Sequence, residues 1–230
     1  MDIDYKKVAA VAAVAYIQPG MTVGFGAGST MAHMINRLKE VPELVAEVAV
    51  VTSSYNTRQL LLEAGFRLQE PGMMAALDIY FDGCDQFDVS LNALKSGGGI
   101  HTKEKLLAAM ATRFVLVADG SKYVERLYTT FPVVIEVIPE AVTFVLRRIR
   151  ELFREVNPQL RLSNRRDGAV MTDNGNMLID IWFTQFPELA EINPLLKGIP
   201  GVLETSLFYW MAHEAVIAGR NGVEVIYKKE

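Results

Sequence analysis

Short apolar runs alternate with longer amphipathic segments through the first half of the chain, which is the pattern of β-strands followed by helices. The apolar, β-favouring runs are Met21–Phe25, Val48–Val51, Leu77–Phe81 and Phe114–Ala118. Because strands alternate with helices, we predict an α/β fold with a mainly parallel sheet, whose loops converge at its carboxyl edge, where ligands usually bind. The predicted helices of this half are Asp4–Ile17, Ser29–Leu38, Thr57–Ala64 and Lys105–Ala111.

The first predicted helix, Asp4–Ile17, has an apolar middle that follows acidic residues and ends at Pro19-Gly20, too early for a bilayer span. The segment is therefore predicted to be an amphipathic helix closed by a turn, and not a signal peptide. Val8, Val11, Ala12 and Ala15 lie on one face of this predicted helix.

From Phe131 onward the pattern changes to short strands and helices in a less regular order. We predict a strand in Pro132–Ala141, a basic-faced helix over Val142–Glu155 and a strand at Leu160–Leu162. Met171–Phe183 has the pattern of a hairpin that turns at Asn174-Gly175, and we interpret TDNGN as structural. The remaining predicted elements are a helix over Glu188–Leu196 and return segments at Ile199–Leu207 and Glu214–Tyr227.

Length, net charge and cysteine content limit the kinds of fold and binding partner that this chain can have. The chain has 230 residues, half of them hydrophobic, so it can bury a sizeable core as one large or two small domains. Its formal net charge of −4 provides no basic surface, and we expect neither nucleic acid nor a membrane as a partner. Cys84 is the single cysteine, which excludes an internal disulfide and fits a reducing, cytoplasmic location.

The segment GFGAGST, residues 24–30, joins a predicted strand to the start of a predicted helix. Glycines let a ligand approach the backbone, and the N–H groups and dipole of a helix N-terminus favour phosphate. A dinucleotide fingerprint would need glycine in place of Ser29, and the Gly-Lys-Ser/Thr of a nucleotide-hydrolase loop is absent. The next strand ends in Thr52-Ser53-Ser54 without an acid for an adenosine ribose, so we expect no nicotinamide cofactor. For this motif alone, a glycine turn that only caps a helix remains the alternative.

The stretch from Asp82 to Glu104 combines three aspartates, Lys95 and the run Gly97–Gly99. Three consecutive glycines allow the backbone to approach a ligand, at a conformational cost that folding alone does not reward. We predict Thr102 as the N-cap of the next helix, which places Glu104 in the first turn. A capping box would need its acid one residue later, so Glu104 is free to face a ligand. The helix dipole would lower its pKa, so a base at this position needs a desolvating site.

Six motifs occur along the chain: GFGAGST, DGCDQFD, LKSGGGIHTKEK, ADGSK, TDNGN and IPGVLE. In this order and spacing they resemble the ribose-5-phosphate isomerase A family, and the resemblance covers nearly the whole chain. The chain departs from the family pattern at Ala27, Cys84, Gln86, Ser96 and Gly120.

The resemblance implies a doubly wound, Rossmann-like sheet with a smaller α+β domain inserted before the C-terminal return. We accordingly expect a catalytic domain of residues 1–128 and 200–230 and a small domain of residues 129–199. The resemblance further implies a cofactor-free isomerase of the pentose phosphate pathway that interconverts D-ribose 5-phosphate and D-ribulose 5-phosphate through an enediol. It also implies a homodimer or homotetramer, for which the apolar residues 199–211 would be a surface. The alternatives are an isomerase of another sugar phosphate and a sugar-phosphate sensor without catalysis.

Isomerisation moves one proton between C2 and C1 and another between O1 and O2, which a carboxylate with a neighbouring acid or lysine performs without a metal. Glu104 is our candidate for the base at carbon. The resemblance implies Asp85 as the proton shuttle between oxygens and Asp82 as a hydroxyl contact, while Lys95 would neutralise the oxyanion. By residue type alone, the aspartates would more often be turn residues and Lys95 a surface lysine.

A thiol between carboxylates is disfavoured as a thiolate, so we predict Cys84 to be a small buried side chain and not a nucleophile. The three histidines, His33, His101 and His213, lack a metal-ligand spacing, and we expect no metal site. Lys7 is a further candidate for the site. The expected substrate-binding residues are Ala27, Gly28, Ser29, Thr30, Asp82, Gly83, Cys84, Asp85, Lys95, Ser96, Gly97, Gly98 and Lys122.

Overall fold

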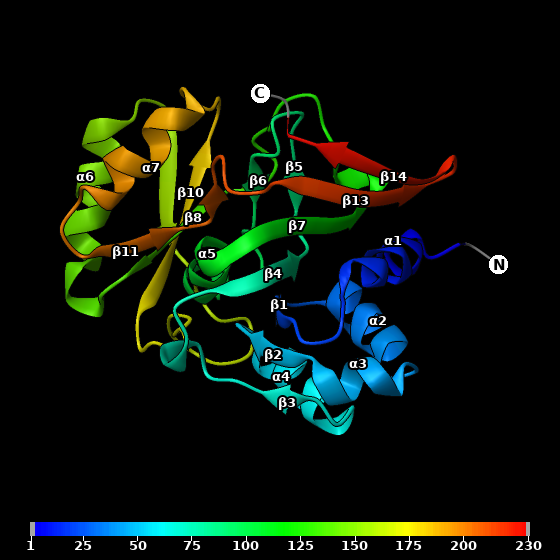
Figure 1. Cartoon of the computed structure of the whole chain (residues 1–230). Helices are drawn as coiled ribbons and strands as arrows, with labels where there is room; N and C mark the ends of the chain where they lie inside the picture. Colours follow the sequence, from blue (N-terminus) through cyan, green and yellow to red (C-terminus); the bar gives the residue numbers. More distant parts are fainter. Residues whose placement is uncertain (1–2, 229–230) are drawn as a thin grey trace.

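The large sheet has seven strands in the order β14-β13-β7-β4-β1-β2-β3, and neighbouring strands are parallel except in the β13–β14 hairpin (Figure 1). The computed structural model describes residues 3–228. It confirms the predicted α/β fold with a mainly parallel, doubly wound sheet. The strands are β1 (Thr22–Phe25), β2 (Ala49–Thr52), β3 (Arg67–Leu68), β4 (Leu77–Asp82), β7 (Ala111–Asp119), β13 (Glu214–Gly219) and β14 (Gly222–Tyr227).

Helices cover both faces of this sheet, because alternate residues of its central strands point to opposite sides. Phe81 and Val115 belong to the core under α1 and α2, whereas Tyr80 and Phe114 belong to the core under α5. The order of the strands reverses between β1 and β4, which is where doubly wound sheets bind ligands. The helices are α1 (Tyr5–Ala13), α2 (Ser29–Leu38), α3 (Pro42–Glu47), α4 (Tyr55–Glu63) and α5 (His101–Met110).

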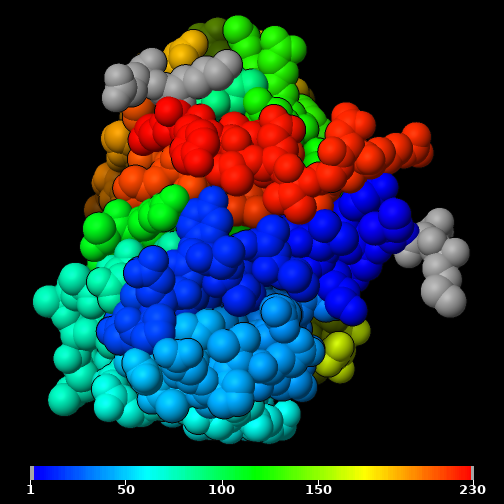
Figure 2. All heavy atoms as spheres, turned by 45° about the vertical axis from the view of Figure 1, so that its right-hand side comes forward, coloured from blue at the N-terminus to red at the C-terminus, as the bar shows by residue number. Residues whose placement is uncertain are grey.

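The N-terminal helix packs through small residues against α2, β7 and β13. Figure 2 shows it in dark blue between the red C-terminal hairpin and the lighter blue segment that contains α2 and α3. Ala9, Ala10 and Ala13 are fully buried, while Val11 is 40% exposed and Ala15 is also exposed. The helix therefore packs through its alanines and leaves Val11 and Ala15 of the apolar face exposed, because alanine lets a helix lie closer to the sheet than valine does.

A second, antiparallel sheet has four strands in the order β11-β8-β10-β9 and carries α6 and α7 on one face (Figure 1). In β8, Val133, Ile135 and Val137 pack in the core under these helices. Val134 and Glu136 therefore point to the opposite face of the sheet. The elements are β8 (Val133–Val137), α6 (Val142–Leu152), β9 (Val156–Leu160), β10 (Met177–Phe183), α7 (Leu189–Lys197) and β11 (Val202–Thr205).

A short sheet has three strands in the order β12-β6-β5, of which β5 and β6 lie between β4 and β7 in the sequence and β12 lies between β11 and β13. Leu207 and Phe208 of β12 are fully buried, so packing within the chain accounts for part of the apolar run at residues 199–211. The strands are β5 (Gln86–Phe87), β6 (Ala93–Leu94) and β12 (Leu207–Phe208), and 3₁₀ helices lie at Val14–Tyr16, Pro71–Met73, Gly120–Lys122 and Pro139–Ala141.

Some predicted boundaries in the small sheet were wrong. The strand predicted at Leu160–Leu162 begins instead at Val156, and it tolerates Pro158 because β9 is an edge strand. Helix α6 stops at Leu152, before Glu155, whose φ of 53° is incompatible with a right-handed helix.

The hairpin turn at Asn174-Gly175 is confirmed, since the Gly175 N–H donates to the Thr172 carbonyl at 3.0 Å. The division into domains after residues 128 and 199 stays a prediction. Within residues 3–228, no helix combines the length and the apolarity that crossing a membrane requires.

Candidate active site

A cavity of about 380 Å³ lies at the carboxyl ends of β1, β4 and β7, where the strand order of the large sheet reverses. It is lined by the loops after these strands and by the first turns of α2 and α5. The structure brings all the predicted site residues to this cavity except Ser96, while their individual roles stay predictions. Those that line it are Ala27, Gly28, Ser29, Thr30, Asp82, Gly83, Cys84, Asp85, Lys95, Gly97, Gly98, Glu104 and Lys122.

The start of α2 forms an anion-binding end of the cavity. Gly28 is the N-cap, and its φ of 90° lies in the left-handed region that favours glycine. It has no side chain to cap the first N–H groups of the helix, which are left for a ligand. Gly26 is needed for close approach, because a Cβ at this position would lie 1.9 Å from the carboxyl carbon of Asp82. Lys6 and Lys122 also line the cavity and add positive charge.

Lys6, and not the sequence candidate Lys7, faces the cavity. Asp4 caps α1 by accepting the N–H groups of Lys6 at 3.1 Å and Lys7 at 3.3 Å through Oδ1, which fixes the rotation of the first turn. Successive residues of a helix point about 100° apart, so only one of two adjacent lysines can face one site.

Lys95 lies buried between two carboxylates. Its Nζ is 2.8 Å from Asp82 Oδ2 and 3.4 Å from Glu104 Oε1, and it donates to the Gly83 carbonyl at 2.6 Å. Only 6% of the side chain is exposed, so the alternative of a surface lysine is wrong. A buried ammonium group needs such partners, because leaving it unpaired would cost several kcal/mol.

Asp82 is fully buried and holds the cluster together. Its Oδ1 accepts the backbone N–H groups of Gly83 at 2.8 Å and Ala27 at 3.3 Å. Its Oδ2 accepts the Tyr80 hydroxyl at 2.7 Å and faces the Lys95 ammonium. Four protein donors therefore occupy the two oxygens, and Asp82 fixes both Lys95 and the turn after β1.

Burial sets the protonation of Glu104. It raises the pKa of Glu104 to about 8, against the opposing effect of the Lys95 ammonium and with a further increase from the Asp82 charge. Burial alone would lower the pKa of Lys95, but the charges of Asp82 and Glu104 hold that pKa above its ordinary value. Glu104 is 5% exposed, so the desolvating environment that a base at this position needs is present. Lys95 thus stays charged, while Glu104 can exchange a proton near neutral pH.

Ser96 lies behind the cavity and not in its wall. Its hydroxyl donates to the Pro132 carbonyl at 2.5 Å, which turns the side chain away from the site. Its backbone N–H donates to Asp85 Oδ2 at 2.6 Å. Ser96 therefore orients the Asp85 carboxylate from behind.

Arg161, just after β9, is a residue that the sequence analysis missed. It pairs with Asp180 at 2.5 Å and donates to the carbonyls of Ser96 at 2.8 Å and Gly97 at 3.2 Å. Because a trans peptide points its C=O and N–H in opposite directions, these bonds turn the following N–H groups away from Arg161. No local signal marks Arg161, since it meets the glycine run only through the arrangement of the sheets.

The departure from the family pattern at Gln86 has a structural explanation. Gln86 donates from Nε2 to the Tyr128 carbonyl at 2.6 Å and accepts the Tyr128 N–H at 3.2 Å, a pairing that glutamate could not complete. Cys84 is half-buried in the cavity wall, so the prediction of a buried side chain was wrong. Its desolvation still raises the pKa of the thiol to about 12, with partial opposition from Lys95, so the thiol stays protonated.

Thr102 is not the N-cap that the sequence predicted. Helix α5 begins at His101, and its N-cap Ile100 makes no side-chain hydrogen bond. The Thr102 hydroxyl instead donates to Glu136 of β8. His101 is buried outside the cavity, with Nε2 3.3 Å from the Glu204 carbonyl. Among residues 3–228, no group of three or more His, Cys, Asp or Glu side chains is arranged to hold a metal ion.

Comparison with known proteins places this chain in a family. The family model for ribose 5-phosphate isomerase A (phosphoriboisomerase A) matches residues 49–222. The ribose-5-phosphate isomerase A of Methanosarcina acetivorans is 39% identical over 230 residues, which cover 100% of this chain and 96% of that protein.

Solved structures agree over the full length. Ribose 5-phosphate isomerase A from Methanocaldococcus jannaschii superposes with a TM-score of 0.89 at 33% identity, over 98% of this chain and 99% of that one. A D-ribose-5-phosphate isomerase in complex with phospho-erythronic acid superposes with a TM-score of 0.91 at 32% identity, over 99% of this chain and 100% of that one. Since sequence, fold and motifs agree over the whole length, the chain belongs to the ribose 5-phosphate isomerase A family.

Proposed function

We propose that this chain interconverts D-ribose 5-phosphate and D-ribulose 5-phosphate through an enediol intermediate. The observation that carries the proposal is the buried contact of 3.4 Å between Lys95 and Glu104, in a cavity that also contains an uncapped helix N-terminus. Aldose–ketose isomerisation needs a base with a pKa near neutrality beside a fixed cation. The names of the relatives, and the phospho-erythronic acid bound by one of them, support the same substrate.

The phosphate of the substrate binds at the start of α2, against Ser29 and Thr30. The free N–H groups and the helix dipole favour an anion there, and Lys6 and Lys122 line the same cavity. Because the phosphate is remote from the reacting carbons, its binding energy serves to position C1 and C2 against Glu104.

Glu104 moves a proton between the two carbons. Its carboxylate takes the proton from C2 of the open-chain aldose, and the electron pair of that C–H bond becomes part of a C1=C2 double bond. The same carboxyl group then returns the proton to C1 on the same face of the planar enediol. A pKa of about 8 keeps the proton-accepting and proton-donating forms both accessible near neutral pH.

Lys95 and Asp85 serve the two oxygens. The Lys95 ammonium, fixed by Asp82, stabilises the negative charge that develops on the enediolate. Asp85 carries a proton from O2 to O1, so that the C2 hydroxyl becomes a ketone and the C1 aldehyde becomes a hydroxyl. One C–H and one O–H bond break and one of each forms, so the reaction consumes no oxidant or reductant.

Among the residues that depart from the family pattern, Ala27 and Cys84 line the cavity, whereas Gln86 and Ser96 do not. Gln86 and Ser96 are both bound to backbone groups outside the cavity, so they leave its shape unchanged. A sensor without catalysis is disfavoured, because binding alone gives no reason to bury Glu104 beside Lys95. A cytoplasmic location and a homodimer or homotetramer are further proposals, which rest on the single cysteine and on the family resemblance.

The experiment that tests this function is Glu104→Gln. The amide keeps the shape of the side chain but cannot accept the C2 proton, so turnover of ribose 5-phosphate should fall by about two to four orders of magnitude. Affinity for phospho-erythronic acid, which is not turned over, should change by no more than about tenfold, because the phosphate site is untouched.

The matched control is Glu191→Gln, which changes the exposed first-turn glutamate of α7. It should leave turnover unchanged, since only a helix-dipole interaction is altered. A Glu104→Gln enzyme with full turnover would refute the mechanism. Assaying the wild-type enzyme on a panel of pentose and hexose phosphates distinguishes ribose 5-phosphate from the alternative substrates.

A further inference from the structure

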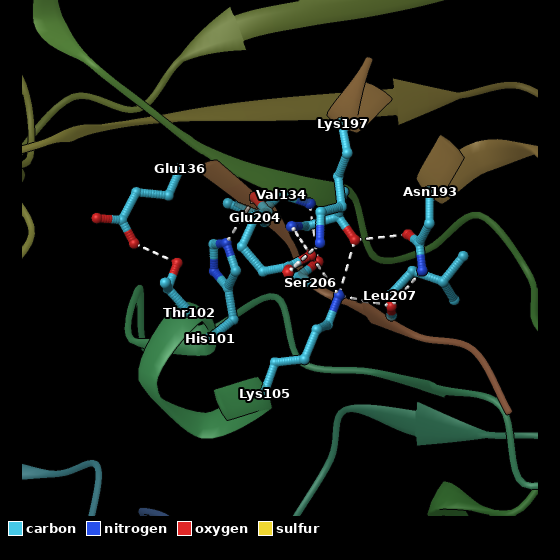
Figure 3. A network of polar contacts seen from close by, with 11 residues as sticks. His101, Thr102, Lys105, Val134, Glu136, Asn193, Lys197, Glu204, Ser206 and Leu207 are labelled. Carbon is cyan, nitrogen blue, oxygen red and sulfur yellow. Dashed lines mark hydrogen bonds and ion pairs between the residues drawn. The ribbon is translucent and has the colours of Figure 1, made fainter. Parts of the chain in front are cut away.

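Three residues near Glu104 on α5 attach this helix to β8 and β11 of the four-stranded sheet (Figure 3). Thr102 donates to Glu136 of β8, and His101 Nε2 lies 3.3 Å from the Glu204 carbonyl of β11. Lys105 Nζ lies 2.9 Å from Glu204 Oε1. The N-cap Ile100 makes no side-chain hydrogen bond, so these side-chain links, and not a cap, attach the start of α5 to its surroundings.

Glu136 is the centre of the link through Thr102. It is fully buried, and its Oε1 accepts the Thr172 hydroxyl at 2.8 Å, Asn174 Nδ2 at 2.9 Å and Asn176 Nδ2 at 2.8 Å. Its Oε2 accepts the Thr102 hydroxyl, and Figure 3 shows the two side chains pointing toward each other. Charge-assisted hydrogen bonds of this kind hold a fixed geometry, and the Glu136 carboxylate takes no part in the proposed reaction.

We infer that Glu136, acting through the Thr102 hydroxyl, is a positioning residue that holds the first turn of α5 and with it the base Glu104. The inference rests on the proposed role of Glu104. The segment before α5 is the glycine run, in which Gly99 has a φ of 69°, so the chain on that side offers little stiffness of its own. A base displaced by about 1 Å can cost on the order of a hundredfold in rate.

The test compares three substitutions: one that removes the hydrogen bond between α5 and Glu136, one that keeps it, and one that removes a different hydrogen bond to Glu136. Thr102→Val keeps the shape and removes the hydroxyl, and it should lower kcat about 10- to 100-fold while KM changes less than about threefold. Thr102→Ser keeps the hydroxyl and should hold kcat within about threefold of the wild type. Asn174→Ala removes one hydrogen bond from the same carboxylate without touching α5, so it should lower the melting temperature and leave kcat near the wild-type value.

Either of two results would overturn the inference: a Thr102→Val enzyme with kcat within about threefold of the wild type, or Asn174→Ala lowering kcat as much as Thr102→Val does. If valine prevents folding, Thr102→Ala takes its place, since alanine is smaller and cannot clash with Glu136. The two proposals fail separately. A wild-type enzyme without turnover of ribose 5-phosphate would end the proposed function, and a fully active Glu104→Gln enzyme would end the role of Glu104 as the base. An inactive Glu104→Gln beside a fully active Thr102→Val would end only the positioning role.

Discussion

Two buried glutamates lie near the first turn of α5, and their surroundings move their pKa values in opposite directions. Burial raises the pKa of Glu104 to about 8, because its one cation, Lys95, is 3.4 Å away and is shared with Asp82. Burial acts in the same direction on Glu136, but hydrogen bonds led by those from Thr102 and Asn174 outweigh it and hold that pKa below its ordinary value.

The two carboxylates differ in the donors around them: four neutral side-chain donors bind Glu136, whereas Glu104 faces one cation. Neutral donors aimed at both oxygens stabilise the charged form of Glu136 in one geometry, so it holds structure and does not exchange protons. Glu104 has one long contact and negative neighbours, so its charged form is costly and a proton is readily taken up. Burial alone therefore does not identify a catalytic acid in this molecule, whereas the set of donors does.

The largest effect expected from this comparison is on stability. Glu136→Ala should lower the free energy of unfolding by at least about 3 kcal/mol, because it leaves several buried donors without an acceptor. Glu104→Gln should change it by less than about 1 kcal/mol at pH 7, because an amide resembles the protonated acid that prevails there. Denaturant unfolding of both variants measures the two values.

Glu140→Ala is the control, since this glutamate is exposed near the end of β8 and its loss should cost no more than about 0.5 kcal/mol. If Glu136→Ala were as stable as Glu140→Ala, the hydrogen bonds to Glu136 would contribute nothing to stability. The structural role of Glu136 would then be refuted.

The next effect concerns pH. If Glu104 must be ionised to accept the C2 proton, kcat/KM should fall about tenfold for each unit below pH 8 and level off above it. Ionisation of the substrate phosphate contributes equally in every variant, so the ratio of wild type to Glu104→Gln isolates the Glu104 limb. If this ratio stays constant between about pH 6 and about pH 9, the assignment of Glu104 as the base is wrong.

The same protonation affects folding. The folded-state pKa of Glu104 lies above its ordinary value of 4.5, so its contribution to stability is complete below pH 4.5 and is lost as the pH rises through about 8. Glu136 has the reverse dependence, because its folded-state pKa is lowered: its contribution is present above pH 4.5 and is lost as the pH falls through the folded-state value.

The position of Glu104 at the ligand edge of the sheet could be predicted from the sequence, whereas the contacts of Glu136 could not. The strands β1, β4 and β7 are local apolar runs, and the glycines and acids that follow them mark the ligand edge. Thr102 was predicted as a cap because local patterns favour that role, but its partner Glu136 lies 34 residues away. Arg161 likewise reaches Ser96 across 65 residues, and no local pattern indicates it.

Smaller errors have the same origin in tertiary structure. The choice between Lys6 and Lys7 depends on how Asp4 fixes the rotation of α1, which hydrophobic spacing does not reveal. The buried face of α1 depends on how closely the helix approaches the sheet, and Ala9 and Ala13 permit an approach that Val11 would prevent. Positions on a helix are thus predicted less well than the helix itself.

The smallest effect expected is at Cys84, which shares the cavity with Glu104 and, like it, has its pKa raised by burial. A carboxyl group raised to about 8 still ionises near neutral pH, whereas a thiol raised to about 12 does not, so the same environment makes one residue reactive and the other inert. Cys84→Ala should therefore keep kcat/KM within about twofold of the wild type, because the thiol supplies neither a nucleophile nor a proton. Alkylation by iodoacetamide at pH 8 provides a second measurement: the native thiol should react at least about a hundredfold more slowly than the thiol of the unfolded chain. Rapid alkylation of the native chain would show that the cavity does not suppress ionisation of the thiol.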